Sequence, residues 1–196
     1  MAADTVPRIQ GLEALIAAQA ATRRPPVDSW HPPYCGDIGM EIRADGTWYY
    51  RDSPIARLAL VKLFASVLRK DADGRHYLVT PAERVDVRVA DAPFLAVEME
   101  VRGTGEAQDL IFRTNVDDIV TASAEHPLRF VGEGAGGGLK PYLGVRGRLE
   151  ALLTRAISYD LAQLVIDAVA DDGSDLGLWS GGVFFALPPA SDPSAP

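Results

Sequence analysis

Residues 35–68 read CGDIGMEIRADGTWYYRDSPIARLALVKLFASVL, and they predict a strand, a tight turn, a second strand and a helix. From Ile38 to Ile42 apolar and polar residues alternate, which is the two-residue period of a half-buried strand. Asp45-Gly46 follows, and this pair indicates a hairpin because glycine accepts the positive φ of a type I′ turn. The aromatic run Trp48–Tyr50 suits the pleated surface of a returning strand.

A helix is expected to begin directly after this hairpin. Ser53 can cap a helix by accepting a backbone hydrogen bond, and Pro54 suits the first helical position, where its missing N–H costs nothing. Large apolar residues then recur at spacings of three and four, which predicts an amphipathic helix of about four turns that lies across the sheet. These residues are Ile55, Leu58, Val61, Phe64 and Leu68.

The composition and charge exclude several classes of protein. The chain has 196 residues, of which 47% are hydrophobic and 23% charged, as in an ordinary globular protein. Its net charge of −8, with no cluster of Lys and Arg, argues against a nucleic-acid partner and against binding to an anionic membrane. No apolar run approaches the length of a spanning helix. The N-terminus lacks a secretory pattern and the single cysteine allows no internal disulfide, so a cytoplasmic location is expected.

The two ends of the chain differ in character from the segments between them. Residues 1–24 contain a predicted helix, marked on one side by Ile9, Leu12 and Ile16 and ended by a run of prolines. Alanine dominates the rest of this helix, which can pack on a domain or on a second copy of the chain. Residues 190–196 form a low-complexity tail that we expect to be disordered.

The rest of the chain predicts mostly strands. Alternation is clearest from Leu95 to Val101, and Gly103–Ala107 follows as a hairpin loop. Leu149–Ala156 predicts a short helix, Ser158–Ala170 fits either a continuing helix or a pair of strands, and Asp171–Asp175 indicates a turn. Further strands are expected at Tyr77–Val79, Val85–Val89, Leu110–Phe112, Ile119–Val120, Leu128–Val131, Lys140–Val145 and Val183–Leu187.

The sequence also suggests an internal duplication. Placing residues 57–65 over residues 146–154 aligns Leu60 with Leu149, and placing Tyr77 over Tyr159 aligns two further segments. If the duplication is real, Ser158–Ala170 is mainly strand. The alternative is that short apolar patterns align by chance.

Aromatic residues and arginines gather around the first hairpin. Aromatic faces with an occasional arginine form pockets for small molecules or anions, and they also form cores. The residues expected to line a ligand-binding cleft are Trp30, Tyr34, Trp48, Tyr50 and Arg57. The alternative is that these aromatic side chains pack in the hydrophobic core.

Patterns for catalysis and metal binding are weaker. Cys35 can act as a nucleophile with His31 as its base, but prolines keep the link between them extended and nothing completes a triad. His31, His76 and His126 are scattered and lack the spacing of metal ligands. We therefore expect no metal and no cofactor.

Two further motifs have plain structural interpretations. Gly132–Gly138 matches a dinucleotide fingerprint by its letters, but that fingerprint needs a helix directly after it, and a strand is expected here. The acidic stretches Thr114–Asp118 and Asp171–Asp175 are interpreted as turns rather than cation sites.

Long segments of the chain resemble a known family. These segments are CGDIGMEIRADGTWYYRDSPIARLALVKLFASVLR, DGRHYLVTPAERVDVRVADAPF, FRTNVDDIV, EHPLRF and PYLGVRGRLEALLTRAISYDL. They resemble the bacterial domain of unknown function family DUF1285 over about residues 28–187. The resemblance implies an α+β protein of two small domains, at residues 25–92 and 93–189, each a strongly curled antiparallel sheet of the β-roll or PH-like type with a packed helix. It implies no known activity and no catalytic residues.

These observations lead us to expect a bacterial cytoplasmic, non-enzymatic module that binds a small ligand or a protein partner in regulation or signal transduction. The expectation rests on two curled domains and on the lack of a catalytic constellation. One alternative is an enzyme that uses Cys35 and His31 or the acidic residues. Another is a structural homodimer formed through the N-terminal helix.

Overall fold

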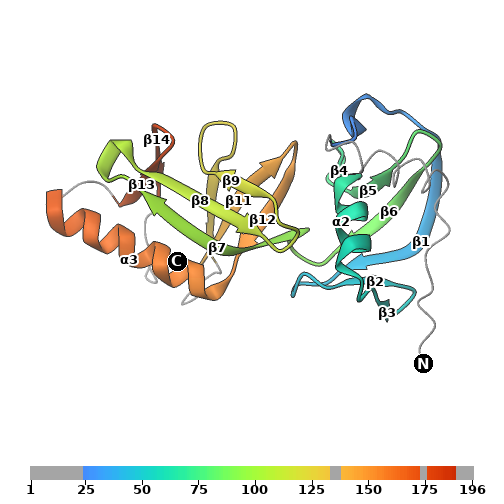
Figure 1. Ribbon diagram of the computed structural model, residues 1–196, viewed down its shortest axis with the longest axis horizontal. Helices are drawn as coiled ribbons and strands as arrows, with labels where there is room; N and C mark the ends of the chain where they lie inside the picture. Colours follow the sequence, from blue (N-terminus) through green and yellow to red (C-terminus); the bar gives the residue numbers. More distant parts are fainter. Residues whose placement is uncertain (1–23, 133–137, 173–175, 189–196) are drawn as a thin grey trace, which may run out of the picture. The chain divides into compact units, whose positions relative to one another are not determined.

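The computed structural model describes residues 24–132, 138–172 and 176–188 (Figure 1). The predicted N-terminal helix, apart from its last residue, and the predicted tail lie outside these residues. The chain divides into two compact units, Met1–Pro93 and Phe94–Pro196, and each contains a curled six-stranded sheet and a helix. None of the helices in the described ranges is long and apolar enough to cross a membrane.

Unit 1 is built on one mixed sheet. Its strand order is β3-β2-β1-β6-β5-β4, and β1 and β6 form the only parallel pair among its described strands. The elements are η1 (Val27–Ser29), β1 (Tyr34–Ile42), β2 (Trp48–Tyr50), β3 (Ser53–Pro54), α2 (Leu58–Ser66), β4 (Leu68–Lys70), β5 (His76–Val79) and β6 (Arg84–Val89).

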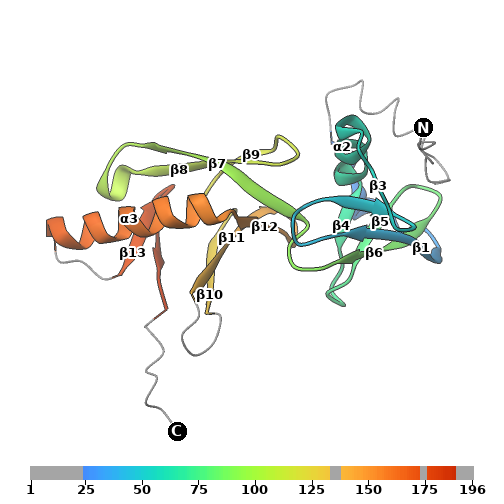
Figure 2. The ribbon, with the colours of Figure 1, turned by 90° about the horizontal axis from the view of Figure 1, so that it is seen from below.

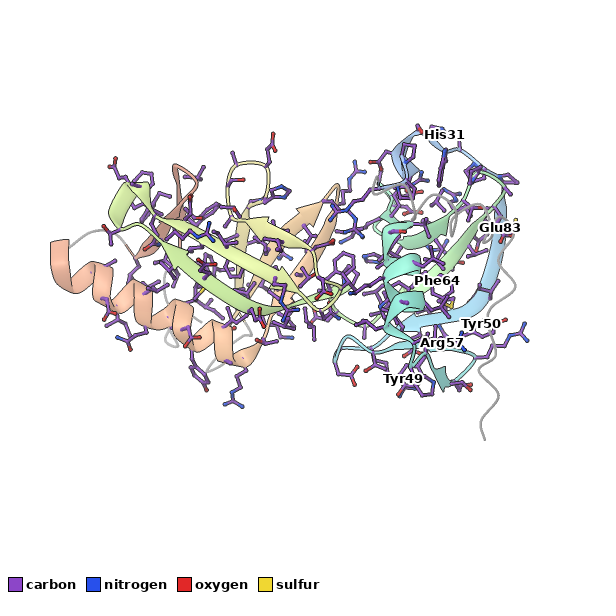
Figure 3. All side chains as sticks on the ribbon, in the orientation of Figure 1. His31, Tyr49, Tyr50, Arg57, Phe64 and Glu83 are labelled. Atoms are coloured by element: carbon purple, nitrogen blue, oxygen red, sulfur yellow. The ribbon has the colours of Figure 1, made fainter. Side chains whose placement is uncertain are left out.

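One face of this sheet packs against α2. Met40, Ile42 and Trp48 take alternate positions on β1 and β2, and all three are buried. The Trp48 ring stacks on Phe64 of α2, with centroids 6.3 Å apart, and Figure 3 shows Phe64 on the helix that faces the sheet. Because side chains alternate along a strand, the intervening residues form the opposite face.

The first hairpin is confirmed, but the helix begins later than the sequence predicts. The turn closes through the Gly46 N–H, which donates to the Arg43 carbonyl oxygen at 2.9 Å. Neither central residue, Ala44 or Asp45, has a positive φ, so the turn is not type I′. Arg51 and Asp52 have φ values of +47° and +65°, and this bend turns the chain back along β2. Ser53–Pro54 therefore pairs as β3, and α2 begins at Leu58.

Unit 2 has a second mixed sheet, with the order β10-β11-β12-β7-β8-β9 and a parallel pair between β12 and β7. A separate hairpin joins β13 to β14. In Figure 2 strands β7–β9 pass above α3, and β10 and β11 descend below it. The elements are β7 (Phe94–Arg102), η2 (Gly105–Ala107), β8 (Asp109–Thr114), β9 (Ile119–Thr121), β10 (Leu128–Gly132), β11 (Leu139–Arg146), β12 (Leu149–Leu153), α3 (Arg155–Asp172), β13 (Gly177–Ser180) and β14 (Val183–Ala186).

One helix predicted in unit 2 is a strand, and a second segment, for which the sequence allowed either a helix or strands, is a helix. Residues 149–153 form strand β12 rather than a helix, and burial there alternates with a period of two. Residues 158–170 belong to helix α3 rather than to strands, because Ile157, Leu161 and Val165 bury one face at a spacing of four. Asp171 and Asp172 also belong to this helix rather than to a turn.

The residue alignment behind the suggested duplication is also wrong, since it places α2 over β12 and β5 over α3. A repeat exists instead in the order of the strands. In both units the first strand lies at the centre of the sheet, and the second and third follow outward to one edge. The fourth strand forms the other edge, and the fifth and sixth lead back to the centre, where the sixth pairs parallel to the first. The helix differs: it lies between the third and fourth strands of unit 1 and after the sixth strand of unit 2. Descent from a duplication stays a prediction.

Candidate functional site

The structure does not bring together the five residues predicted to line a cleft. Trp48 and Tyr50 are buried, with 1% and 8% of their surface exposed, and they belong to the core of unit 1. Arg57 is exposed at the N-terminus of α2. Trp30 is half-buried beside η1. Figure 3 shows its neighbour His31 at the opposite end of unit 1 from Arg57.

The two residues of the predicted catalytic pair have separate contacts. His31 Nδ1 lies 3.1 Å from the carbonyl oxygen of Ser29, and the Cys35 thiol donates to the carbonyl of Pro33 at 3.6 Å. Within the described ranges no hydrogen bond joins His31 to Cys35. In the same part of the chain no three His, Cys, Asp or Glu side chains are arranged to hold a metal ion.

Tyr34, the fifth predicted residue, lies in a group of charged and aromatic side chains centred on Asp86. Asp86 is 7% exposed. Its Oδ1 accepts a hydrogen bond from Arg75 Nη2 at 2.5 Å, and its Oδ2 accepts one from the Tyr34 hydroxyl. The Arg75 guanidinium carbon lies 5.5 Å from the ring centroid of Tyr77, and that of Arg84 lies 4.6 Å from it. These donors compensate for the burial of the carboxylate.

A second carboxylate, Asp71, fixes Arg69 and Arg84 of unit 1. Arg69 donates from Nε to Oδ1 at 2.6 Å, and Arg84 donates from Nη1 to Oδ2 at 2.8 Å. Arg69 also donates from Nη1 to the carbonyl oxygens of Val27 and Trp30, at 2.6 and 2.9 Å. The side chains of β4 and β6 are therefore held in place, together with the η1 segment.

Irregular pairing of β1 with β6 places Tyr34 and Asp37 beside Asp86. The register pairs Tyr34 with Arg84 and Asp37 with Asp86, so three residue steps on β1 match two on β6. Gly36, with φ of +86°, supplies a backbone conformation that glycine adopts readily. Such bulges re-aim side chains, and they are common near functional sites.

A pocket of about 380 Å³ opens next to this group. Its polar lining consists of Asp37, Arg75, His76, Asp86 and Arg88. The Arg75 side chain is 55% exposed although it is paired with Asp86. Arg88 is also exposed, and no hydrogen bond or ion pair with another described residue engages it. The pocket therefore presents two guanidinium groups, one of them unengaged within the described chain.

Hydrogen bonding sets the charge state of a neighbouring pair. The Tyr77 hydroxyl donates to Asp73 Oδ2 at 2.6 Å. Burial, and then this hydrogen bond, raise the pKa of Tyr77 above its ordinary value. The same hydrogen bond, and then one from the backbone N–H of Arg75, lower the pKa of Asp73. The pair is therefore a neutral phenol and a carboxylate across the neutral pH range.

Most of this group was not predicted from the sequence, although one signal is present in it. Arg84, Asp86 and Arg88 alternate with valines along β6, and Val85 and Val87 are buried on the other side of the strand. A strand with charges on one face predicts a polar surface.

The acidic turn after β8 is structural. Thr114 Oγ1 accepts a hydrogen bond from the Asp118 N–H at 3.0 Å, and the Asn115 side chain accepts one from the Leu95 N–H at 3.0 Å. Asp118 pairs with Arg146. These contacts agree with the interpretation of Thr114–Asp118 as a turn.

Two family models match the chain. Residues 25–92 match the N-terminal domain of DUF1285, a domain of unknown function, and residues 93–187 match the C-terminal domain of the same family of proteins of unknown function. The chain belongs to the DUF1285 family. The resemblance seen in the sequence is therefore confirmed.

Solved structures of DUF1285 proteins share this architecture. The crystal structure of a DUF1285 family protein from Silicibacter pomeroyi DSS-3 is 44% identical, with a TM-score of 0.76, and the match covers 88% of this chain and 93% of that one. A DUF1285 family protein from Shewanella baltica OS155 is 28% identical, with a TM-score of 0.51, and the match covers 65% of this chain and 92% of that one. No curated protein matches the chain.

Proposed function

We propose that this DUF1285 protein is a non-enzymatic, cytoplasmic binding module that takes up a small polar ligand with an anionic group and serves regulation. The observation that carries the proposal is the pocket of about 380 Å³ beside Asp86, where Arg88 is exposed and unengaged by other described residues. Pockets of roughly 300–1,000 Å³ suit small molecules, and this one falls at the lower end of that range.

The chemistry of the lining favours an anion over a neutral molecule. Arg88 and Arg75 present planar guanidinium groups, which bind carboxylates and phosphates through paired hydrogen bonds. Asp37 and Asp86 line the same pocket, so a ligand that also carries an amine or hydroxyl group finds acceptors there. A small zwitterion or a hydroxylated acid satisfies both requirements.

The arginines also favour binding over catalysis. A guanidinium group keeps its proton throughout the accessible pH range, so it fixes charge in place and cannot relay protons. The carboxylate of Asp86 is already held by Tyr34 and Arg75, which suits a positioning role. A site of fixed charges supports recognition of a ligand, and recognition without turnover is what a regulatory module needs.

A thermal-shift screen against a panel of small carboxylates, phosphates and amino acids tests the proposal. A ligand at about 100 times its Kd should stabilise the protein by ~2.7 kcal/mol, a shift of several degrees. We expect Arg88→Ala to abolish the shift. Two control variants should keep the ligand-induced shift. Arg148→Ala removes another exposed arginine with no partner among the described residues, and Arg57→Ala removes the arginine at the start of α2. A panel without a hit, or a hit that survives Arg88→Ala, would contradict this use of the pocket.

A further inference from the structure

A groove in unit 2 lies between helix α3 and strands β11 and β12. It encloses about 700 Å³, and its apolar lining includes Leu139, Pro141, Leu153 and Ala162. A smaller cavity of about 60 Å³ shares Leu139, Pro141 and Ala162 with it and continues to Phe130 of β10. The groove therefore reaches from the start of α3 to the edge of the sheet.

Strand β10 forms that edge. Within the described residues it pairs only with β11. Its five residues make it the longest of the edge strands, since β3 has two and β4 and β9 have three each. The outer side of an edge strand presents unpaired N–H and C=O groups, which can pair with another chain.

Unit 1 shows how the corresponding edge can be occupied. In the shared strand order β4 takes the place of β10. There the η1 segment lies against the edge strand, because Arg69 of β4 donates to the carbonyl oxygens of Val27 and Trp30. No such segment covers β10 in the part of unit 2 that the structure describes.

The charges in the groove indicate the kind of chain that it accepts. Lys140 and Arg155 line it, and no acidic side chain does so among the described residues. Arg155 donates to the Tyr159 hydroxyl at 3.0 Å, and Tyr159 is 62% exposed. In a chain with a net charge of −8, a groove with two cations selects an acidic partner.

We propose that an acidic, extended peptide segment of a partner protein binds this groove by adding a strand to β10. Alternate side chains of an added strand point to one face of the sheet. On the face that carries Phe130 they enter the apolar groove beside Ala162, and acidic residues of the peptide pair with Lys140 and Arg155. This binding uses no residue of the pocket beside Asp86, so its test is independent of the test of the proposed function.

Selection from a displayed library of random dodecapeptides on the full chain tests the proposal. We expect enriched sequences in which apolar residues alternate and Asp or Glu is present. Ala162→Trp fills the groove from an exposed helix position. In anisotropy titrations with a fluorescein-labelled enriched peptide, it should lower the affinity for the peptide at least about tenfold. Ala156→Trp makes the same change at an exposed position of α3 outside the groove, and should leave binding within about twofold.

Hydrogen exchange separates strand addition from other occupants. Bound peptide should slow amide exchange in Leu128–Gly132 and leave Ile119–Thr121, the edge strand at the other end of the sheet, unchanged. Lys140→Glu is a second variant that changes charge without filling the groove, and it should also lower the affinity for the peptide.

Three results would overturn the proposal: no sequence is enriched, Ala162→Trp leaves the affinity for an enriched peptide unchanged, or the peptide does not protect the amides of β10. Dodecanoate bound in the groove without protection of β10 would make it a site for small amphiphiles instead. A dimer seen by light scattering and lost in Ala162→Trp, without peptide enrichment, would assign the groove to a second copy of the chain.

Discussion

Trp48→Ala tests whether the aromatic residues of the first hairpin form a core or the wall of a ligand site. Trp48 is 1% exposed and stacks on Phe64 with centroids 6.3 Å apart. A buried aromatic side chain removes about 150–250 Å² from water, which at ~25 cal/mol per Å² corresponds to roughly 4–6 kcal/mol. We expect the substitution to lower the free energy of unfolding of unit 1 by about 3–5 kcal/mol.

Two variants calibrate this effect. The indole N–H of Trp48 has no hydrogen-bond partner within the described chain, so Trp48→Phe loses area but no hydrogen bond and should cost about 1–2 kcal/mol. Trp30→Ala makes the same truncation at a half-buried position. There the backbone carbonyl, rather than the ring, accepts the hydrogen bond from Arg69, so we expect a loss of about 1 kcal/mol or less.

Urea unfolding followed by far-UV circular dichroism measures these differences by linear extrapolation. A double-mutant cycle with Phe64→Leu should give a coupling energy of about 0.5–1.5 kcal/mol between the two rings. A free energy of unfolding of Trp48→Ala within about 1 kcal/mol of the parent protein, together with the loss of a ligand, would refute a core role for the ring. That result would mean that the ring serves binding rather than packing.

Three further predictions concern the site and the backbone around it. The pKa of Tyr77 is raised in the folded state, so its contribution to stability is complete below its unfolded pKa of about 10. This contribution is lost as the pH rises through the folded pKa. Tyr77→Phe should therefore reduce the fall of the melting temperature at alkaline pH. The pKa of Asp73 is lowered, so its contribution to stability is complete above its unfolded pKa of about 3.9. It is lost as the pH falls through the folded pKa, so Asp73→Asn should reduce the fall of the melting temperature at acid pH. Gly39 has φ of +82°, and a Cβ there would lie 3.1 Å from Arg51 Cγ, so Gly39→Ala should lower the urea midpoint by an amount equivalent to about 1–2 kcal/mol. Gly132→Ala, where a Cβ meets nothing within 4 Å, is the control.

Local periodicity in the sequence was enough to predict most strands. Leu95–Val101 lies within β7, and the valines of β6 alternate with charged residues as expected. The predicted helix start at Ser53 was wrong because Arg51 and Asp52 have positive φ values. Residues other than glycine rarely adopt such values, so the sequence does not indicate them. The short apolar run at Leu149 fits both a helix and a strand, and its parallel pairing with β7 decides between them. Such pairing depends on residues far away in the chain, which local periodicity does not report.

The candidate site was harder to predict for the same reason. Tyr34 and Asp86 meet only because β1 and β6 pair in parallel across an irregular register. Aromatic content alone pointed to Trp48 and Tyr50, but alternation along β2 turns these two side chains toward α2. A charge pattern on one face of β6 was the better guide, since polar residues at alternate positions of a strand indicate a solvated or binding face.

The position of the helix accounts for the different places of the two proposed sites on one strand order. In unit 1 the helix precedes β4, and the η1 segment lies against that edge strand. The polar face of the sheet then carries the pocket beside Asp86. In unit 2 the helix follows β12, so α3 and strands β11 and β12 line the apolar groove, and a smaller cavity continues from it to Phe130 of the edge strand β10. If the two sheets descend from one ancestor, the change in helix position altered which part of the sheet is left uncovered, for the proposed small anion in unit 1 and for the proposed peptide in unit 2.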